Sequence, residues 1–418
     1  MQFSRFGEKF TSRSGILSLM DDLGEAVAEG NTLMLGGGNP GHIPEVVEHF
    51  RARLNAILGE AGGLERMVGS YDPPDGNREF REALAALLER EFGWQISYRN
   101  IALTNGSQSA FFMLFNLFAG DMPDGTRKKI LLPLAPEYIG YADAGLTPDF
   151  FVAAKPSFEY LEPHIFKYRV DFDALEIDES IAAMCVSRPT NPTGNVLTDA
   201  EISRLEALTA EHDIPLILDN AYGTPFPNII FTDAKPRWTD KTIVCMSLSK
   251  LGLPGVRTGI VIAPETVVEA LSGINAILNL APGNFGAQLA MDLVKSGDIL
   301  DISRRLVRPF YEKRAHDAIR VLTTELGDVD FYIHKPEGAI FLWLWFKDLP
   351  ITSAELYERL KNRGVLIISG HHFFPGIAEP WVHKNECIRV TCSQDWPSVE
   401  QGLKIIAAEA KRAYAQSG

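Results

Sequence analysis

Between about residues 98 and 262 the sequence alternates short apolar runs, turn residues and helical patterns, and this alternation constrains the fold most strongly. The apolar runs predict five strands, each followed by residues that favour turns: 100–103, 129–134, 182–186, 214–218 and 242–246. These runs are continuously apolar, as is typical of parallel strands that helices cover on both faces. We therefore expect an α/β fold with a mostly parallel central sheet in a large domain.

Helical patterns separate these strands. Residues 108–118 predict a long apolar helix, and Thr198-Asp199-Ala200-Glu201 has the spelling of a capping box. Beyond residue 300 the order changes, with helix patterns at 302–326, 353–363 and 398–415 and strand patterns at 339–346, 365–368 and 387–390. We expect a smaller α+β domain here. The predicted boundaries are 46–298 for the large domain, and 1–45 with 299–418 for the small one.

Charge and hydropathy exclude several classes of protein. The 418 residues include 40 Lys and Arg against 54 Asp and Glu, a formal net charge of -14, which argues against nucleic-acid partners and anionic membrane surfaces. The longest apolar runs, 109–120 and 338–346, are shorter than the ~20 residues of a membrane span. The first ten residues lack the apolar core of a secretory signal, and four cysteines make no disulfide framework. We expect a cytoplasmic protein without membrane or nucleic-acid partners.

Polar residues collect where the predicted strands end. Ligands of open α/β sheets bind beyond the carboxyl ends of the strands, so these residues are candidates for one site. In chain order they are Asn105, Gly106, Ser107, Gln108, Tyr138, Asn191, Asp219, Tyr222, Ser247, Ser249, Lys250 and Arg257. Alone, Asn191 could belong to a turn, Asp219 could cap a helix and Lys250 could lie on the surface. Their spacing of 28 and 31 residues, one βα unit each, favours a shared site.

The order of the motifs Asn191-Pro192-Thr193-Gly194, Asp219-x-x-Tyr222, Ser247-x-Ser249-Lys250 and Arg257 resembles that of the fold-type-I pyridoxal-phosphate (PLP) aminotransferases, over the full length of the chain. Longer stretches are similar to the bacterial valine–pyruvate branch of that family: 34–40, 103–120, 133–146, 185–196, 247–255 and 335–352. The resemblance implies the PLP-dependent transferase fold type I and pyridoxal 5'-phosphate as cofactor. It further implies a ping-pong exchange of an amino group between L-valine, or a similar aliphatic amino acid, and a 2-oxo acid such as pyruvate.

The resemblance also implies roles for individual residues. Lys250 would hold the cofactor aldehyde as a Schiff base and then act as a general base, and Asp219 would keep the ring nitrogen protonated. Tyr222 and Asn191 would hydrogen-bond the phenolic oxygen of the ring. The cofactor phosphate would lie at a helix N-terminus. Its binding group would be Gly106, Ser107, Gln108, Ser247 and Arg257, with Tyr138 stacked on the ring and Gly38, Asn191 and Arg389 binding the substrate carboxylate.

One tyrosine implies an assembly. Tyr71 matches a family tyrosine that reaches the phosphate of the neighbouring subunit, which implies a homodimer with shared active sites.

The interval between Lys250 and Arg257 holds six residues where many family members have seven, and the shorter form recurs in the aminoadipate and kynurenine branch. Other PLP enzymes would use the same residues, for example an aromatic or aminoadipate transaminase or a β-lyase.

Three further interpretations have less support from the residues. The stretch 36–41 satisfies the dinucleotide pattern G-x-G-x-x-G, but Pro40 lies within it and no clear strand pairing precedes residue 98. The adjacent His371 and His372 point apart and lack a third ligand at a familiar spacing, so we expect a loop and no metal. A non-catalytic transaminase-like regulator would need a DNA-binding module, whereas about 35 residues precede Gly36 and the chain is acidic.

Overall fold

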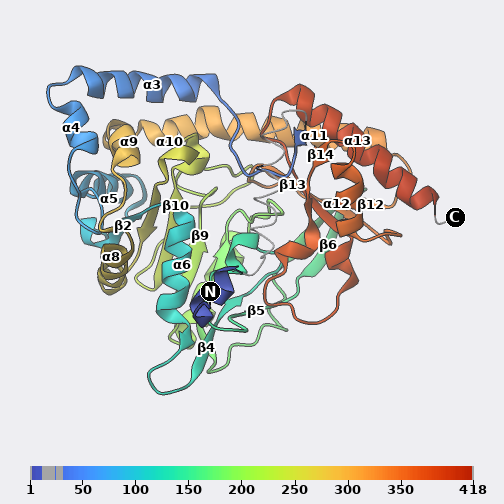
Figure 1. The fold of residues 1–418 in the computed structure, drawn as a ribbon, viewed down its shortest axis with the longest axis horizontal. Helices are drawn as coiled ribbons and strands as arrows, with labels where there is room; N and C mark the ends of the chain where they lie inside the picture. Colours follow the sequence, from blue (N-terminus) through green and yellow to red (C-terminus); the bar gives the residue numbers. More distant parts are fainter. Residues whose placement is uncertain (1, 12–23, 25–31, 417–418) are drawn as a thin grey trace.

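The computed structural model describes residues 2–11, 24 and 32–416, and these form two large sheets with helices packed around them (Figure 1). The first sheet has eight strands. Their order is β2 (Ile101–Thr104), β11 (Gly259–Ile262), β10 (Thr242–Ser247), β9 (Leu216–Asp219), β8 (Ile181–Ser187), β4 (Arg127–Leu132) and β3 (Gly120–Asp121), with β5 (Phe151–Ala153) also paired to β4.

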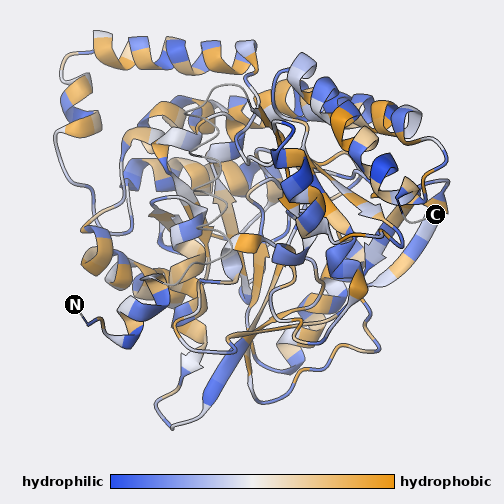
Figure 2. Ribbon diagram, turned by 45° about the vertical axis from the view of Figure 1, so that its right-hand side comes forward, coloured by the Kyte–Doolittle hydropathy of each residue, from blue (hydrophilic) through white to orange (hydrophobic). Residues whose placement is uncertain are grey.

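This first sheet confirms the predicted α/β architecture. The neighbours β4, β8, β9 and β10 are parallel, and their carboxyl ends therefore meet at one edge. The sequence did not predict β11, which runs antiparallel to both β10 and β2. The five predicted strands correspond to β2, β4, β8, β9 and β10, each within three residues at either end. Figure 2 shows these central strands as mostly hydrophobic, as their burial requires.

Helices α6 (Ser107–Phe118) and α7 (Asp199–Glu211) follow strands β2 and β8 as predicted. The capping box of α7 is present, since Thr198 Oγ1 accepts from the Glu201 amide at 3.1 Å and Glu201 Oε2 accepts from the Thr198 amide at 2.8 Å. Figure 1 shows α3 along the upper edge of the molecule with α4 at its end. Among the described residues before 297, the other α-helices are α1 (Arg5–Thr11), α3 (Pro44–Gly59), α4 (Gly63–Val68), α5 (Arg78–Phe92), α8 (Glu265–Asn279) and α9 (Phe285–Ser296).

The second sheet gathers strands from two distant parts of the chain. Its order is β15 (Ile368–Ser369), β16 (Cys387–Thr391), β13 (Phe341–Phe346), β12 (Phe331–His334), β7 (Ile165–Arg169) and β6 (Ser157–Glu162). The sequence had predicted no strand at β6 or β7. The predicted helices correspond to α10 (Asp298–Ile302), a π-helical turn (Ser303–Val307) and α11 (Arg308–Leu326), to α12 (Ser353–Lys361) and to α13 (Trp396–Ala415).

The domain boundaries remain a prediction. Strands β6 and β7 lie within the predicted large domain, 46–298, yet pair with strands from the range 299–418. Of the predicted small-domain segment 1–45, residues 12–23 and 25–31 lie outside the described residues.

Two sequence motifs lie in secondary structure that differs from what their patterns suggest. The stretch 36–41 lies between α3 and β1 (Leu33–Met34), and β1 pairs with β14 (Val365–Leu366) in a two-stranded sheet, so it opens no βαβ unit. His371 and His372 belong to a 3-10 turn rather than a loop, and their ring centroids lie 3.9 Å apart, so the prediction that they point apart is wrong. Within the described ranges, no cluster of three or more His, Cys, Asp or Glu residues could hold a metal. No helix in the described part of the chain is long and apolar enough to cross a membrane.

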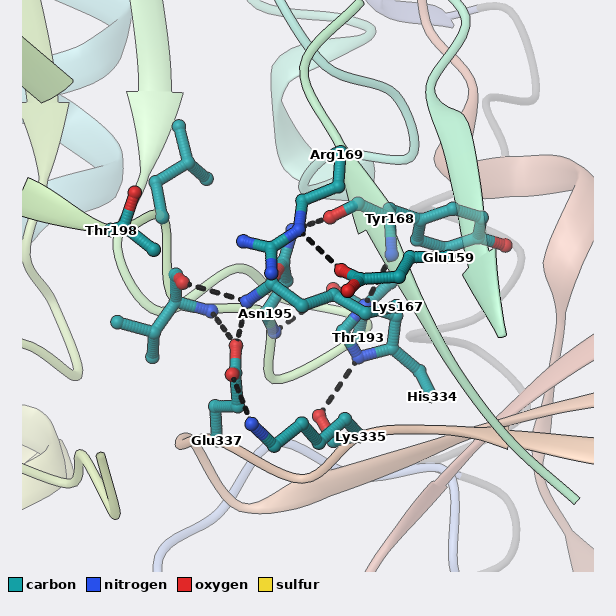
Figure 3. Close-up of polar contacts among 12 residues, drawn as sticks. Glu159, Lys167, Tyr168, Arg169, Thr193, Asn195, Thr198, His334, Lys335 and Glu337 are labelled. Carbon is teal, nitrogen blue, oxygen red and sulfur yellow. Dashed lines mark hydrogen bonds and ion pairs between the residues drawn. The ribbon is translucent and has the colours of Figure 1, made fainter. Parts of the chain in front are cut away.

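A buried ion pair connects the second sheet to the loop that follows β8 (Figure 3). Lys167 of β7 pairs with Glu337, which lies between β12 and β13, and the two side chains are 2% and 6% exposed. Lys167 Nζ also donates to the Val196 carbonyl at 3.0 Å, and Glu337 accepts from the Val196 amide at 3.2 Å. Asn195 Nδ2 donates to the Tyr168 carbonyl at 3.1 Å. The loop containing Asn195 and Val196 is therefore held against the second sheet on both sides.

Substitution of Glu337 tests this connection. In Glu337→Gln the buried Lys167 ammonium loses its counter-charge, and the free energy of unfolding should decrease by about 3 kcal/mol. The matched control is Glu159→Gln, which removes one partner of the half-buried Arg169 but leaves Glu201 as the other. The control should change stability by less than ~1 kcal/mol. Guanidinium unfolding followed by circular dichroism measures both, and equal effects would contradict the structural role of the pair.

Candidate active site

A cavity of about 590 Å³ lies where strands β8, β9 and β10 end. Eleven of the thirteen predicted site residues line it: Gly38, Ser107, Gln108, Tyr138, Asn191, Asp219, Tyr222, Ser247, Lys250, Arg257 and Arg389. Gly106 lies directly beside Arg257. Tyr71 does not line this cavity and is 85% exposed.

The carboxylate of Asp219 lies buried at the end of β9. Tyr141 Oη donates to Asp219 Oδ2 at 2.7 Å, and the Ala221 amide donates to Oδ1 at 2.9 Å. Burial raises the pKa of Asp219 to about 6, while the Tyr141 hydrogen bond, the Ala221 amide and the charge of Lys250 act in the opposite direction. Asp219 is thus a carboxylate kept ionised near neutral pH by a small set of donors.

The amine of Lys250 faces the same cavity from a 3-10 turn (Ser249–Leu251) that directly follows β10. Its Nζ donates to the Gly38 carbonyl at 2.5 Å and lies 5.2 Å from the centre of the Tyr222 ring. Desolvation, followed by the positive charges of Arg389 and Arg257, lowers the pKa of Lys250 to about 8. A sizeable fraction of this amine is therefore neutral near physiological pH and available as a nucleophile or base.

Arg389 enters the cavity from β16, between β13 and β15 in the second sheet. It is 3% exposed and therefore lies inside the protein. Its Nη1 donates to Asn191 Oδ1 at 2.7 Å and its Nη2 to the Gly36 carbonyl at 2.6 Å, while the guanidinium lies 4.0 Å from the centre of the Phe341 ring. Burial lowers the pKa of Arg389 to about 10, which leaves it charged at neutral pH.

The N-terminus of α6 and Arg257 form an anion-binding corner. Gly106, the N-cap residue, has φ +88° and provides no side-chain cap, and a Cβ there would lie 2.1 Å from Arg257 Nη2. Only glycine therefore lets the guanidinium approach this closely. Arg257 Nη1 donates to Ser249 Oγ at 3.4 Å, and Ser247 Oγ accepts from the Ser249 amide at 3.1 Å. The helix dipole and the guanidinium both favour an anion here.

The sequence did not predict three buried polar residues near Asp219, one of which, Ser187, lines the cavity. Ser187 is the last residue of β8, Tyr141 ends the 3-10 turn Ile139–Tyr141, and Glu137 follows the apolar run 130–136. All three are buried, and they connect to Asp219 by hydrogen bonds. The signal that could have found Glu137 is a lone acidic residue at the end of a buried strand, where an unpartnered carboxylate would be costly.

Comparisons with known proteins identify the family of this chain. The family model described as Aminotransferase class I and II matches residues 33–406. The valine–pyruvate aminotransferase of Escherichia coli (strain K12) is 52% identical over 417 residues, covering 100% of both chains. The solved structure of valine–pyruvate aminotransferase from Salmonella typhimurium LT2 is 49% identical with a TM-score of 0.89, over 96% of this chain and 100% of that one.

A more distant structure shares the fold alone. The α-aminoadipate aminotransferase of Thermus thermophilus is 20% identical with a TM-score of 0.78, over 99% of this chain and 98% of that one. The match of the family model to most of the chain, with the full-length relative at 52% identity, establishes the family. The chain belongs to the aminotransferase class I and II family.

Proposed function

We propose that this aminotransferase depends on PLP and exchanges an amino group between L-valine, or a similar aliphatic amino acid, and a 2-oxo acid such as pyruvate. The observation that carries the proposal is one cavity that joins the amine of Lys250, the carboxylate of Asp219 and the guanidinium of Arg389. The names of the Escherichia coli and Salmonella typhimurium relatives support the choice of valine and pyruvate.

The residues of the cavity fit PLP. Two buried polar atoms in its wall, Gln108 Oε1 and Arg389 Nε, have no hydrogen-bond partner among the described residues, as expected of groups that complete their bonding with a ligand. The phosphate would be held at the anion-binding corner by Gly106, Ser107, Gln108, Ser247 and Arg257. When bound, PLP supplies an electron-withdrawing ring that stabilises negative charge on the substrate α-carbon.

The remaining cofactor contacts follow from the positions of the side chains. Asp219 would pair with the ring nitrogen, because it is a buried carboxylate that stays largely ionised near neutral pH. Asn191 and Tyr222 would donate to the phenolic oxygen, since burial raises the pKa of Tyr222 and keeps its hydroxyl protonated. Tyr138 would lie against one face of the ring. Lys250, whose amine has a lowered pKa, would form the covalent bond to the cofactor.

The chain's own residues then account for proton movement and orientation. Arg389 would bind the α-carboxylate of the amino acid, with Asn191 and the Gly38 amide completing the contact. This would direct the α-hydrogen toward Lys250, and the neutral amine would move that proton from the α-carbon as a general base. Two half-reactions, one with each partner acid, would produce ping-pong kinetics.

The composition of the cavity wall favours an aliphatic side chain. Its charged described residues are Asp219, Lys250, Arg257 and Arg389, and the functions above occupy each of them. No further cation among the described lining residues remains for a second substrate carboxylate. Met34, Ile139 and Pro189 supply apolar surface instead. An apolar amino acid would therefore bind here without leaving a charged group unpaired.

An exposed apolar region supports the predicted homodimer. Asn275 Nδ2 donates to the Pro74 carbonyl, and Asn284 Nδ2 donates to the Arg66 carbonyl at 3.0 Å, so the end of α8 lies against the segment containing α4 and Tyr71. Large apolar side chains are exposed across these segments: Leu64, Val68, Tyr71, Ile277, Leu278, Leu280 and Phe285. A second copy covering this region would bring Tyr71 toward the partner's cavity, as the family resemblance implies.

The substrate proposal is tested by the first half-reaction. L-valine and L-alanine should convert the visible absorbance of the PLP-loaded protein rapidly, whereas L-aspartate should react about 100-fold more slowly because its second carboxylate would be unpaired. Stopped-flow absorbance across an amino-acid panel measures this, with D-valine as the stereochemical control. A faster release of ammonia and pyruvate from a cysteine conjugate would instead favour a β-lyase.

The role of Lys250 predicts a pH-dependent uptake of PLP. Only the neutral amine attacks an aldehyde, so the rate of uptake by the cofactor-free protein should rise with pH and level off above about 8, the pKa of Lys250. Lys250→Ala should remove the visible absorbance, and Lys250→Arg should keep the charge without restoring it. The exposed Lys295→Ala is the matched control. Normal turnover by Lys250→Ala would refute the proposal.

The dimer is tested by charging the exposed apolar region. Ile277 is 87% exposed, and Ile277→Asp should convert a dimer to a monomer, because a buried unpaired carboxylate opposes association. Val382→Asp is the control, since Val382 is 70% exposed on the turn Val382–Asn385, away from these segments. Sedimentation velocity distinguishes the two species. A dimer that persists in Ile277→Asp with unchanged affinity would place the interface elsewhere.

A further inference from the structure

Glu137 is a fully buried acid for which the proposed function has no role. It follows β4, and its amide donates to the Phe373 carbonyl at 2.8 Å, which fixes the backbone at this point. A buried carboxyl group without partners would be strongly destabilising, so the contacts of its side chain indicate its purpose.

The carboxyl group of Glu137 is directed at Ser187. The Ser187 amide donates to Oε1 at 2.8 Å, and Ser187 Oγ donates to Oε2 at 2.6 Å. The amide of Tyr138, the residue expected against the cofactor ring, donates to Oε2 at 3.2 Å. Glu137 thus holds the hydroxyl of Ser187 in place and contacts the backbone of a proposed cofactor-binding residue.

From Ser187 the contacts continue to Asp219. Ser187 Oγ lies 3.4 Å from Tyr141 Oη, where either hydroxyl can donate, and Tyr141 Oη donates to Asp219 Oδ2 at 2.7 Å. Strands β8 and β9 pair Ser187 with Asp219 in register, so the two ends of the path are fixed by the sheet itself. The four side chains of Glu137, Ser187, Tyr141 and Asp219 form one continuous buried path.

Hydrogen bonds at both ends fix this path. Burial raises the pKa of Glu137 to about 8, while the Ser187 hydroxyl and amide act in the opposite direction. Ser187 Oγ donates to Glu137 at 2.6 Å, and Tyr141 Oη donates to Asp219 at 2.7 Å. Glu137 thereby fixes the Ser187 hydroxyl against the Tyr141 hydroxyl, which is the side-chain donor to Asp219.

Other titratable groups around the path stay neutral or are already accounted for. Burial raises the pKa of the neighbouring thiols and phenols, which are Cys185, Cys245, Tyr138, Tyr141 and Tyr222. Lys250 is the cation that acts on Asp219. Glu137 is therefore the second acid of this buried cluster and the one placed to control the donors of the first.

We propose that Glu137 is a positioning residue that fixes Ser187 and, through it, the Tyr141 hydroxyl that donates to Asp219, and so helps to hold Asp219 ionised for the ring nitrogen of PLP. This inference rests on the proposed function. The action of Glu137 is indirect, because it acts on Asp219 through Ser187 and Tyr141 rather than by a direct contact with Asp219 or Lys250.

The experiment interrupts the path at Ser187 and alters it at Glu137. In Ser187→Ala and Glu137→Leu, Asp219 loses support for its ionised form, so the ring nitrogen is less protonated and the nitrogen joining Lys250 to PLP binds its proton more tightly. The pH midpoint of the visible absorbance should rise by about 0.5 to 1 unit, and the Kd for PLP should increase about three- to tenfold. Glu137→Gln keeps an acceptor for the Ser187 hydroxyl and should retain the wild-type midpoint.

Controls separate this effect from loss of fold. Glu386→Gln alters a buried acid that accepts from Trp345 Nε1 at 2.8 Å away from the cavity, and it should leave the midpoint unchanged. Thermal unfolding without PLP reports the structural cost of each variant. If Ser187→Ala and Glu137→Leu titrate like the wild type, the inference is overturned while the proposed function stands. If the wild type acquires no visible absorbance with PLP, the proposed function fails and this inference with it.

Discussion

The burial of the Asp219 carboxylate at the end of β9 is the constraint around which the site is built. A carboxylate in this position needs donors, and Tyr141 and the Ala221 amide provide them at 2.7 and 2.9 Å. The parallel neighbours β8 and β10 then fix Ser187 on one side and the turn that carries Lys250 on the other. The sheet therefore determines how the acid and the amine of the cavity face each other.

The second sheet completes this arrangement through two buried contacts. Arg389 on β16 donates to Asn191 Oδ1 at 2.7 Å, and Lys167 with Glu337 holds both backbone groups of Val196. Both contacts act on the loop after β8, from opposite ends. The position of Asn191 thus depends on residues from β7 and β16, although its motif looks like a simple turn in the sequence.

Local sequence signals predicted the first sheet and most of the cavity because both follow from strand ends. Continuous apolar runs located β8, β9 and β10, and the polar residues predicted after them line one cavity. Strand β7 was missed because Lys167 interrupts its apolar pattern. Glu337, the partner whose charge makes the burial of Lys167 possible, lies 170 residues further along the chain. Glu137 and Ser187 are 50 residues apart, so their contact was likewise invisible in a local pattern.

The charge of the cavity differs in sign from that of the chain. The protein carries a formal net charge of -14, but the charged described residues of the cavity are three cations, Lys250, Arg257 and Arg389, and one acid, Asp219. Burial, followed by the positive charges of Arg389 and Arg257, lowers the pKa of Lys250 to about 8, and burial lowers that of Arg389 to about 10. A bound phosphate and a bound carboxylate would relieve this repulsion. In the proposed function, the same burial that lowers the pKa of Lys250 would therefore also favour the binding of anions beside it.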